Sequence, residues 1–250
     1  MSSSTARSSS TNRPSLTARG RLAFALDYPD LVAAEAGASL VAPEVGVLKV
    51  GLELYVKEGP AAVTMAKSLG CEVFLDLKLH DIEQTVARAV ATASSLGVRY
   101  LTIHTAGGPG MMTAAAQRAL KENSQLCVLG VTVLTSLSDQ DLRAVGVEES
   151  TEQHVLRLAR LAQQCGLGGL VCSTMEVAAV RAAVGAEMVL VTPGVRPLGA
   201  DAGDQKRVGT PAQAIAAGSS LLVVGRPIRD AADPRGAARA IRAEMEAVLG

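Results

Sequence analysis

The stretch Phe74–Ile82 is apolar apart from a few residues that could do chemistry, above all Asp76 and Lys78. On a β-strand, side chains two residues apart point to the same face and lie ~6.6 Å apart. Asp76 and Lys78 therefore face one way together with Phe74, and the leucines between them face the other way. Charges on an inward strand face are costly unless they are paired or used. The pair indicates either a salt bridge on a half-exposed strand or an acid and an ammonium group placed for catalysis.

Eight apolar runs with strand character alternate with Ala-rich helical runs along the 250 residues. The predicted strands are Leu22–Leu26, Val45–Gly51, Glu72–Leu77, Tyr100–His104, Leu126–Leu134, Gly169–Cys172, Met188–Val191 and Leu221–Val224. Continuous apolar strands interleaved with helices indicate a parallel sheet covered by helices. Eight such units predict an α/β protein with a single-domain (β/α)₈ TIM barrel. A doubly wound open sheet is the alternative, although no G-x-G-x-x-G follows the first strand.

In such a barrel the reactive groups stand at the C-terminal ends of the strands. Polar and charged residues gather at those positions here: Asp27, Lys49, Asp76, Lys78, Thr102, His104, Thr132, Thr135, Thr192, Arg196 and Arg226. Unrelated surface salt bridges would not sort to one end of the strands. The pattern therefore favours a functional role for Asp76 and Lys78.

The ends of strands seven and eight are the usual phosphate site of TIM barrels. This region contains Gly194, Arg196, Gln205, Gly225 and Arg226. Glycines let backbone N–H groups approach an anion, and arginine offers phosphate a two-pronged donor. The long polar segment Pro197–Gly209 is predicted to fold over a ligand as a lid. The alternative is a pair of ordinary turn glycines beside solvated arginines.

Composition narrows the possible partners and the compartment. Lys+Arg and Asp+Glu are 24 each and aromatic residues are 2%, which argues against a nucleic-acid binder. No apolar run reaches the length of a membrane span. The four cysteines show no C-x-x-C spacing, which predicts reduced thiols in a cytoplasmic protein.

Residues 1–20 differ from the rest of the chain. They are rich in Ser and Thr, contain three arginines and have no acid. This composition predicts a disordered tail ahead of a catalytic barrel domain over residues 21–250. An organellar transit peptide is the alternative.

The run from Asp76 to Ile82 resembles the D-x-K-x-x-D-I signature of the orotidine 5′-phosphate decarboxylases. The resemblance extends over residues 21–230, where further positions match that family's pattern in order and approximate spacing: Asp27, Lys49, Thr135, Arg196, Gln205, Gly225 and Arg226. The D-x-K-x-x-D signature alone is shared with related barrels, whereas the combination is specific.

The resemblance implies the loss of CO₂ from orotidine 5′-phosphate to give UMP, with no cofactor and no metal. It also implies a homodimer in which Asp81 and Ile82 reach the substrate bound to the partner subunit. From its position just beyond the third strand, Asp81 is also expected to cap the following helix.

The resemblance further implies roles for individual residues. Lys78 is the proton donor, within a charge network of Lys49, Asp76, Lys78 and Asp81. The implied substrate-binding residues are Asp27 and Lys49 at the ribose, Thr135 at the base, Gln205 and Arg226 at the phosphate, and in addition Asp76, Ile82, Thr85, Pro193, Arg196 and Gly225. Whether Asp76 repels the substrate carboxylate or the network better suits the carbanion stays open.

Two other functions remain possible at this stage. One is a Mg²⁺-dependent decarboxylase or aldolase of sugar phosphates on a related barrel, which would carry an acid where Lys49 stands. The other is a catalytically silent barrel that only binds a nucleotide, which would have lost Lys78 or one of the aspartates.

Overall fold

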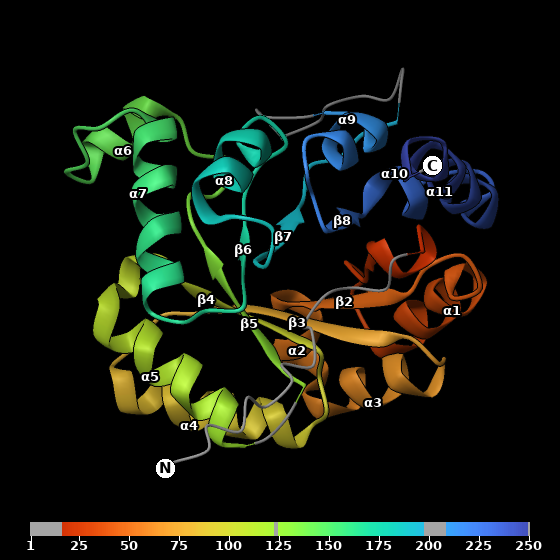
Figure 1. The fold of residues 1–250 in the computed structure, drawn as a ribbon. Helices are drawn as coiled ribbons and strands as arrows, with labels where there is room; N and C mark the ends of the chain where they lie inside the picture. The colour runs from red at the N-terminus through yellow and green to blue at the C-terminus, as the bar shows by residue number, and fades with distance from the viewer. Residues whose placement is uncertain (1–16, 123–124, 198–208, 250) are drawn as a thin grey trace, which may run out of the picture.

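The computed structural model describes residues 17–122, 125–197 and 209–249. Eight parallel strands close into a barrel in the order of the sequence, as predicted (Figure 1). The strands are β1 Leu22–Ala25, β2 Val47–Gly51, β3 Glu72–Leu79, β4 Tyr100–His104, β5 Cys127–Val131, β6 Gly169–Val171, β7 Val189–Thr192 and β8 Leu221–Val224. The bounds of β4 and β8 are as predicted, and those of the other strands differ by one to three residues. The larger differences include β3, which continues to Leu79, and β5, which ends at Val131 rather than Leu134.

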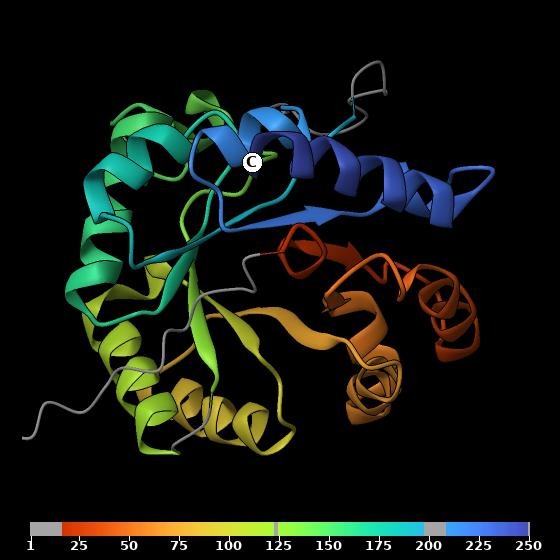
Figure 2. The same ribbon diagram turned by 45° about the vertical axis from the view of Figure 1, so that its right-hand side comes forward.

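Helices surround the barrel on its outer side (Figures 1 and 2). The α-helices are α1 Leu31–Val41, α2 Leu52–Glu58, α3 Pro60–Ser68, α4 Glu83–Ser95, α5 Gly108–Lys121, α6 Asp139–Ala144, α7 Thr151–Gln164, α8 Val177–Val184, α9 Pro211–Ala216, α10 Arg226–Arg229 and α11 Pro234–Leu249. Two 3₁₀ turns, η1 Arg19–Arg21 and η2 Thr105–Gly107, complete the described elements. None of these helices has both the length and the apolar character that crossing a membrane requires.

Alternation along the strands creates two apolar cores. One face of each strand packs against the helices, and the other fills the barrel interior. Phe74 and Tyr100 meet edge to face inside the barrel, with ring centroids 6.1 Å apart. Because the interior is filled by side chains, a ligand site can form only at an end of the barrel.

Residues 17–20, which were assigned to the predicted tail, are among the described residues. Ala18 is buried, and the Arg19 guanidinium donates hydrogen bonds to the carbonyls of Ala42 and Pro43 at 3.1 and 3.2 Å. These contacts fasten the start of the barrel to the segment before β2. Residues 1–16 lie outside the described ranges, and their disorder stays a prediction.

The four cysteines are free thiols, as predicted. Cys71, Cys127 and Cys172 are buried, whereas Cys165 at the end of α7 is partly exposed. Burial raises the pKa of the Cys127 thiol to about 12.

One buried carboxylate ties the first and last parts of the chain together. Glu44, between α1 and β2, is 4% exposed and bonds three arginines of α11. Arg235, Arg239 and Arg242 approach its carboxylate at 3.1, 3.3 and 2.7 Å. Burial raises the pKa of Glu44, but the three guanidinium groups outweigh it and hold that pKa below its ordinary value. This Glu44 clasp joins the segment between α1 and β2 to α11.

We expect Glu44→Gln to destabilise the barrel, because a neutral amide cannot replace the buried carboxylate that pairs with three guanidinium groups. The loss should be about 1–3 kcal/mol, or about 2–4 °C in melting temperature per kcal/mol. Glu246→Gln is the matched control, since Glu246 pairs with the same Arg242 at 3.3 Å but is exposed. A carboxylate with a depressed pKa stabilises the fold only while it is ionised. The difference in melting temperature between wild type and Glu44→Gln should therefore become smaller as the pH falls through the pKa of Glu44. Equal melting temperatures at neutral pH would contradict the clasp.

Candidate active site

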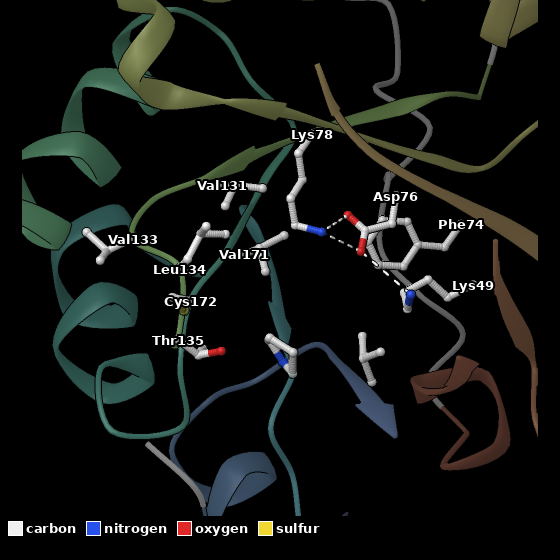
Figure 3. Close-up of a pocket in the computed structure, with 12 residues that line it drawn as sticks. Lys49, Phe74, Asp76, Lys78, Val131, Val133, Leu134, Thr135, Val171 and Cys172 are labelled. Atoms are coloured by element: carbon white, nitrogen blue, oxygen red, sulfur yellow. Dashed lines mark hydrogen bonds and ion pairs between the residues drawn. The ribbon is translucent and has the colours of Figure 1, made fainter. Parts of the chain in front are cut away.

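An alternating row of charges lies at the C-terminal end of the barrel, with Asp76 at its centre (Figure 3). Lys78 Nζ is 2.8 Å from both carboxylate oxygens of Asp76. Lys49 Nζ is 3.7 Å from Asp76 Oδ2 and 3.3 Å from Asp27 Oδ1. The row therefore runs Asp27, Lys49, Asp76, Lys78, contributed by the ends of β1, β2 and β3.

The alternation predicted for β3 is confirmed. Phe74, Asp76 and Lys78 line a cavity on the inner side of the strand. Leu75, on the opposite side, belongs to the outer core between strands and helices, and Leu77 and Leu79 pack against that core. The apolar face anchors β3, so the charged face is held toward the cavity.

Lys78 occupies a strained backbone position. Its φ is +50°, and no other residue except glycine has a positive φ in the described ranges. For a residue with a Cβ this left-handed conformation costs roughly 1–2 kcal/mol. The register of β3 against β4 breaks at the same place: Leu75 pairs with Leu101 and Leu79 with Ile103, so four residues of β3 span two of β4. Strain of this kind is often stored at functional sites.

Asp76 is ionised in spite of its burial. Its side chain is 13% exposed, and desolvation raises its pKa. The charges of Lys49 and Lys78, with hydrogen bonds from Lys78 and Thr102, outweigh the desolvation and hold the pKa of Asp76 below its ordinary value. The site therefore keeps a buried carboxylate anion between two ammonium groups at neutral pH.

The cavity has a volume of about 200 Å³ and two kinds of wall. Lys49, Asp76 and Lys78 lie on one side (Figure 3), and Thr135 and Pro193 also line the cavity. The apolar lining comes from Phe74, Val131, Val133, Leu134, Val171, Cys172 and Val223. A ligand in this cavity would meet charges along one edge and apolar side chains along the other.

The structure brings most of the predicted cluster together. Lys49, Asp76, Lys78, Thr135 and Pro193 all line the cavity. Asp27 adjoins it through its bond to Lys49. Gly225 lies beside Asp27, because a Cβ at Gly225 would stand 3.3 Å from Asp27 Oδ2.

Three of the predicted phosphate residues, Arg196, Gly225 and Arg226, follow β7 and β8 and are not part of the cavity lining. Arg196 is mostly buried and donates a hydrogen bond to the carbonyl of Val195 at 3.0 Å. Its backbone N–H bonds the carbonyl of Gly209 at 3.0 Å, so the two ends of the predicted lid meet there. Arg226 opens α10 directly after Gly225. Gln205 and the rest of the lid fall outside the described residues, so this phosphate site stays a prediction.

Asp81, Ile82 and Thr85 stand apart from the cavity of their own chain. All three are exposed, and none contributes to its lining. The helix cap expected from Asp81 is wrong: α4 begins at Glu83, and its N-cap is Ile82 with no side-chain hydrogen bond. The Asp81 carboxylate instead accepts the N–H of Ile82 at 2.6 Å.

Sequence reasoning gave no role to two parts of the site. Thr102 on β4 is fully buried and donates its hydroxyl proton to Asp76 Oδ1 at 2.9 Å. The only sequence signal that could have indicated this role of Thr102 was its position near the C-terminal end of a predicted strand. The apolar lining from β5, β6 and β8 was also missed, because apolar residues fill both faces of a buried parallel strand and do not mark the inward side.

The described ranges contain no group of three or more His, Cys, Asp or Glu side chains that could hold a metal ion. A reaction without metal stays a prediction. Taken together, a closed parallel barrel and a row of paired charges at the C-terminal ends of its strands define an enzyme of the (β/α)₈ barrel class.

Comparison with known proteins gives the family. Residues 20–241 match the orotidine 5′-phosphate decarboxylase / HUMPS family, and the chain belongs to this family.

Two relatives named orotidine 5′-phosphate decarboxylase cover nearly the whole barrel. The protein of Anaeromyxobacter sp. (strain K) is 58% identical over 225 residues, which is 90% of this chain and 98% of the relative. That of Moorella thermoacetica is 50% identical over 237 residues, or 92% and 94% of the two chains. The crystal structure of orotidine 5′-phosphate decarboxylase from Lactobacillus acidophilus is similar, with a TM-score of 0.80 at 33% identity over 93% of this chain and 99% of that one.

Proposed function

We propose that this protein converts orotidine 5′-phosphate into UMP and CO₂ in pyrimidine biosynthesis, without a metal or a cofactor. Family membership and the 58% identity to a relative of that name support the activity. The observation that carries the mechanism is the Asp76 carboxylate held between Lys49 and Lys78 beside an apolar cavity.

The reaction requires charge stabilisation and a proton. Loss of CO₂ from C6 of the pyrimidine leaves a vinylic carbanion with no conjugated electron sink. A fixed cation beside C6 stabilises that charge, because preorganised groups need no rearrangement at the moment of reaction. The Lys78 ammonium, oriented by its two 2.8 Å contacts with Asp76, supplies both the cation and the proton that ends the reaction.

The two walls of the cavity suit the change in the leaving group. The substrate carboxylate would lie beside Lys78 and close to the anionic Asp76. Val131, Leu134 and Val171 face this region and offer a carboxylate no hydrogen bonds (Figure 3). Neutral CO₂ is compatible with such a wall, whereas a carboxylate is not. The environment therefore favours the product over the carboxylate form of the substrate.

The remaining predicted roles extend the proposal to the rest of the substrate. Asp27 and Lys49 bind the ribose hydroxyls, and Thr135 and Pro193 enclose the base. Arg196, Gln205, Gly225 and Arg226 hold the phosphate. Binding energy from the phosphate, remote from C6, would be used to close the site around the reacting carbon.

We further propose a homodimer in which Asp81 and Ile82 of one subunit complete the site of the other, with Thr85 beside them. Ile82 is 74% exposed, and on α2 Leu52 and Val56 are 59% and 76% exposed. Large apolar side chains exposed to water are typical of a surface that another molecule covers. A second copy seated there would bring an additional carboxylate toward Lys78 and extend the alternating charges.

The position of Lys49 disfavours the Mg²⁺-dependent alternative. Its ammonium stands between the carboxylates of Asp27 and Asp76, where those two acids would otherwise attract a divalent cation. A silent nucleotide-binding barrel is disfavoured because Lys78 and all the matching aspartates are present.

We expect Lys78→Ala to lower kcat by about 10⁴-fold or more, because both the proton donor and the cation at C6 are removed. Affinity for UMP, measured by isothermal titration calorimetry, should change only a few-fold, since the phosphate and ribose groups remain. Lys121→Ala, at the exposed end of α5, is the matched control and should behave as wild type. Turnover retained in Lys78→Ala would remove this residue from its role.

Treatment with EDTA followed by desalting should leave kcat and KM unchanged, because Lys49 and Lys78 supply the positive charge that a metal would bring. The measurement is the decrease in orotate absorbance before and after chelation. Loss of activity that added Mg²⁺ restores would instead support the metal-dependent alternative.

Asp76→Ala and Asp81→Ala homodimers should each be inactive, whereas subunits of the two variants assembled together should recover turnover. In a mixed dimer one site has both mutations and the other has neither, so random pairing predicts about one quarter of wild-type activity. Each variant refolded alone is the control. Absence of recovery in verified mixed dimers would contradict a shared site.

A further inference from the structure

The hydroxyl group of Thr102 makes two hydrogen bonds that join two parts of the charge row. It donates to Asp76 Oδ1 at 2.9 Å, and it accepts the backbone N–H of Lys78 at 2.9 Å. A threonine hydroxyl has one proton to give and lone pairs to accept, so both bonds can form at once. Thr102 is fully buried on β4, and its hydroxyl is thus kept from water.

The break in the β3–β4 register explains why β3 needs this contact. Because four residues of β3 span two of β4, the residues from Asp76 to Lys78 cannot all find main-chain partners on β4. The N–H of Lys78 is bonded by the Thr102 side chain in place of a carbonyl. A buried N–H without an acceptor is costly, so this bond favours the backbone conformation at φ +50° that Lys78 adopts.

We propose that Thr102 is a positioning residue for the decarboxylation, a role that rests on the proposed function. One hydroxyl fixes the backbone that carries the proton donor Lys78 and the carboxylate that orients its ammonium. Without this hydroxyl, Lys78 and Asp76 no longer share a hydrogen-bond partner on β4. The ammonium then spends less time at C6, while the groups that bind ribose and phosphate are unaffected.

The test compares Thr102→Val with Thr102→Ser. Valine keeps the shape and removes the hydroxyl, whereas serine keeps the hydroxyl. Thr105→Val is the matched control, because Thr105 is also buried but its hydroxyl donates to the Val131 carbonyl at 2.8 Å and not to the Asp76 carboxylate. The readouts are kcat and KM for orotidine 5′-phosphate across a pH series, together with the melting temperature.

We expect Thr102→Val to lower kcat about tenfold or more with KM within about threefold of wild type, since the lost contacts serve the reacting groups.

The acid limb of the kcat profile of Thr102→Val should move to higher pH. The groups that face Asp76 are Lys49 on β2, Lys78 on β3, and Thr102 and His104 on β4, and Thr102 contributes a hydrogen bond that lowers the Asp76 pKa. Removing it raises that pKa, so the carboxylate becomes protonated at a higher pH. In Thr102→Ser and Thr105→Val, the acid limb of the kcat profile should lie at the same pH as in the wild type.

Three results would overturn the proposal. The first is an unchanged kcat and an unshifted acid limb in Thr102→Val. The others are a loss of kcat in Thr102→Ser as large as that in Thr102→Val, or the same shift of the acid limb in Thr105→Val. If Thr102→Val does not fold, Thr102→Ala should show the same shift of the acid limb, and an unshifted limb there also overturns the proposal. Failure of the proposed function looks different, because the wild-type protein would then show no turnover at any pH.

Discussion

Asp76 carries a negative charge into a region where burial opposes ionisation, and two ammonium groups compensate for it. Lys78 contacts both carboxylate oxygens at 2.8 Å, and Lys49 lies 3.7 Å from the second oxygen. Each charge in this group would be costly alone, since an unpaired buried charge loses its hydration without a substitute. The lysines and the aspartate therefore depend on one another, and the surrounding structure has to keep the ends of β2 and β3 in fixed positions.

The barrel meets this requirement through β3. The leucines of β3 pack against the outer core, and Phe74 belongs to the core inside the barrel. Near its C-terminal end, the backbone of β3 takes a positive φ at Lys78. A strand that followed regular pairing with β4 would place Lys78 one pleat further from Thr102. Because β3 has two extra residues at this point, both the Asp76 carboxylate and the Lys78 backbone N–H can hydrogen-bond the hydroxyl of Thr102. Local strain and a broken register are thus part of how the reactive groups are positioned.

The sequence predicted the fold and the charged cluster because both depend on local patterns. Eight apolar runs between helices are sufficient for a parallel barrel, and the period of two on β3 places Asp76 and Lys78 on one side. The bulge at Lys78 was not predictable, because it depends on how β3 pairs with β4 and not on any residue with a special backbone preference. The same limit applies to Thr102, whose role depends on contacts with a strand 26 residues away. Asp81 was expected to cap α4, but its carboxylate bonds the adjacent N–H and the helix starts later.

The central claim is that Lys78, held by Asp76, protonates the carbanion left at C6 when CO₂ departs. The most direct measurement mixes the wild-type protein with orotidine 5′-phosphate in heavy water and follows both the orotate absorbance and the mass of the nucleotide product. Exchangeable ammonium protons of Lys78 would then be deuterons. The expected result is a loss of absorbance and UMP that carries one deuterium at C6. No absorbance change, or UMP without deuterium at C6, would contradict the claim.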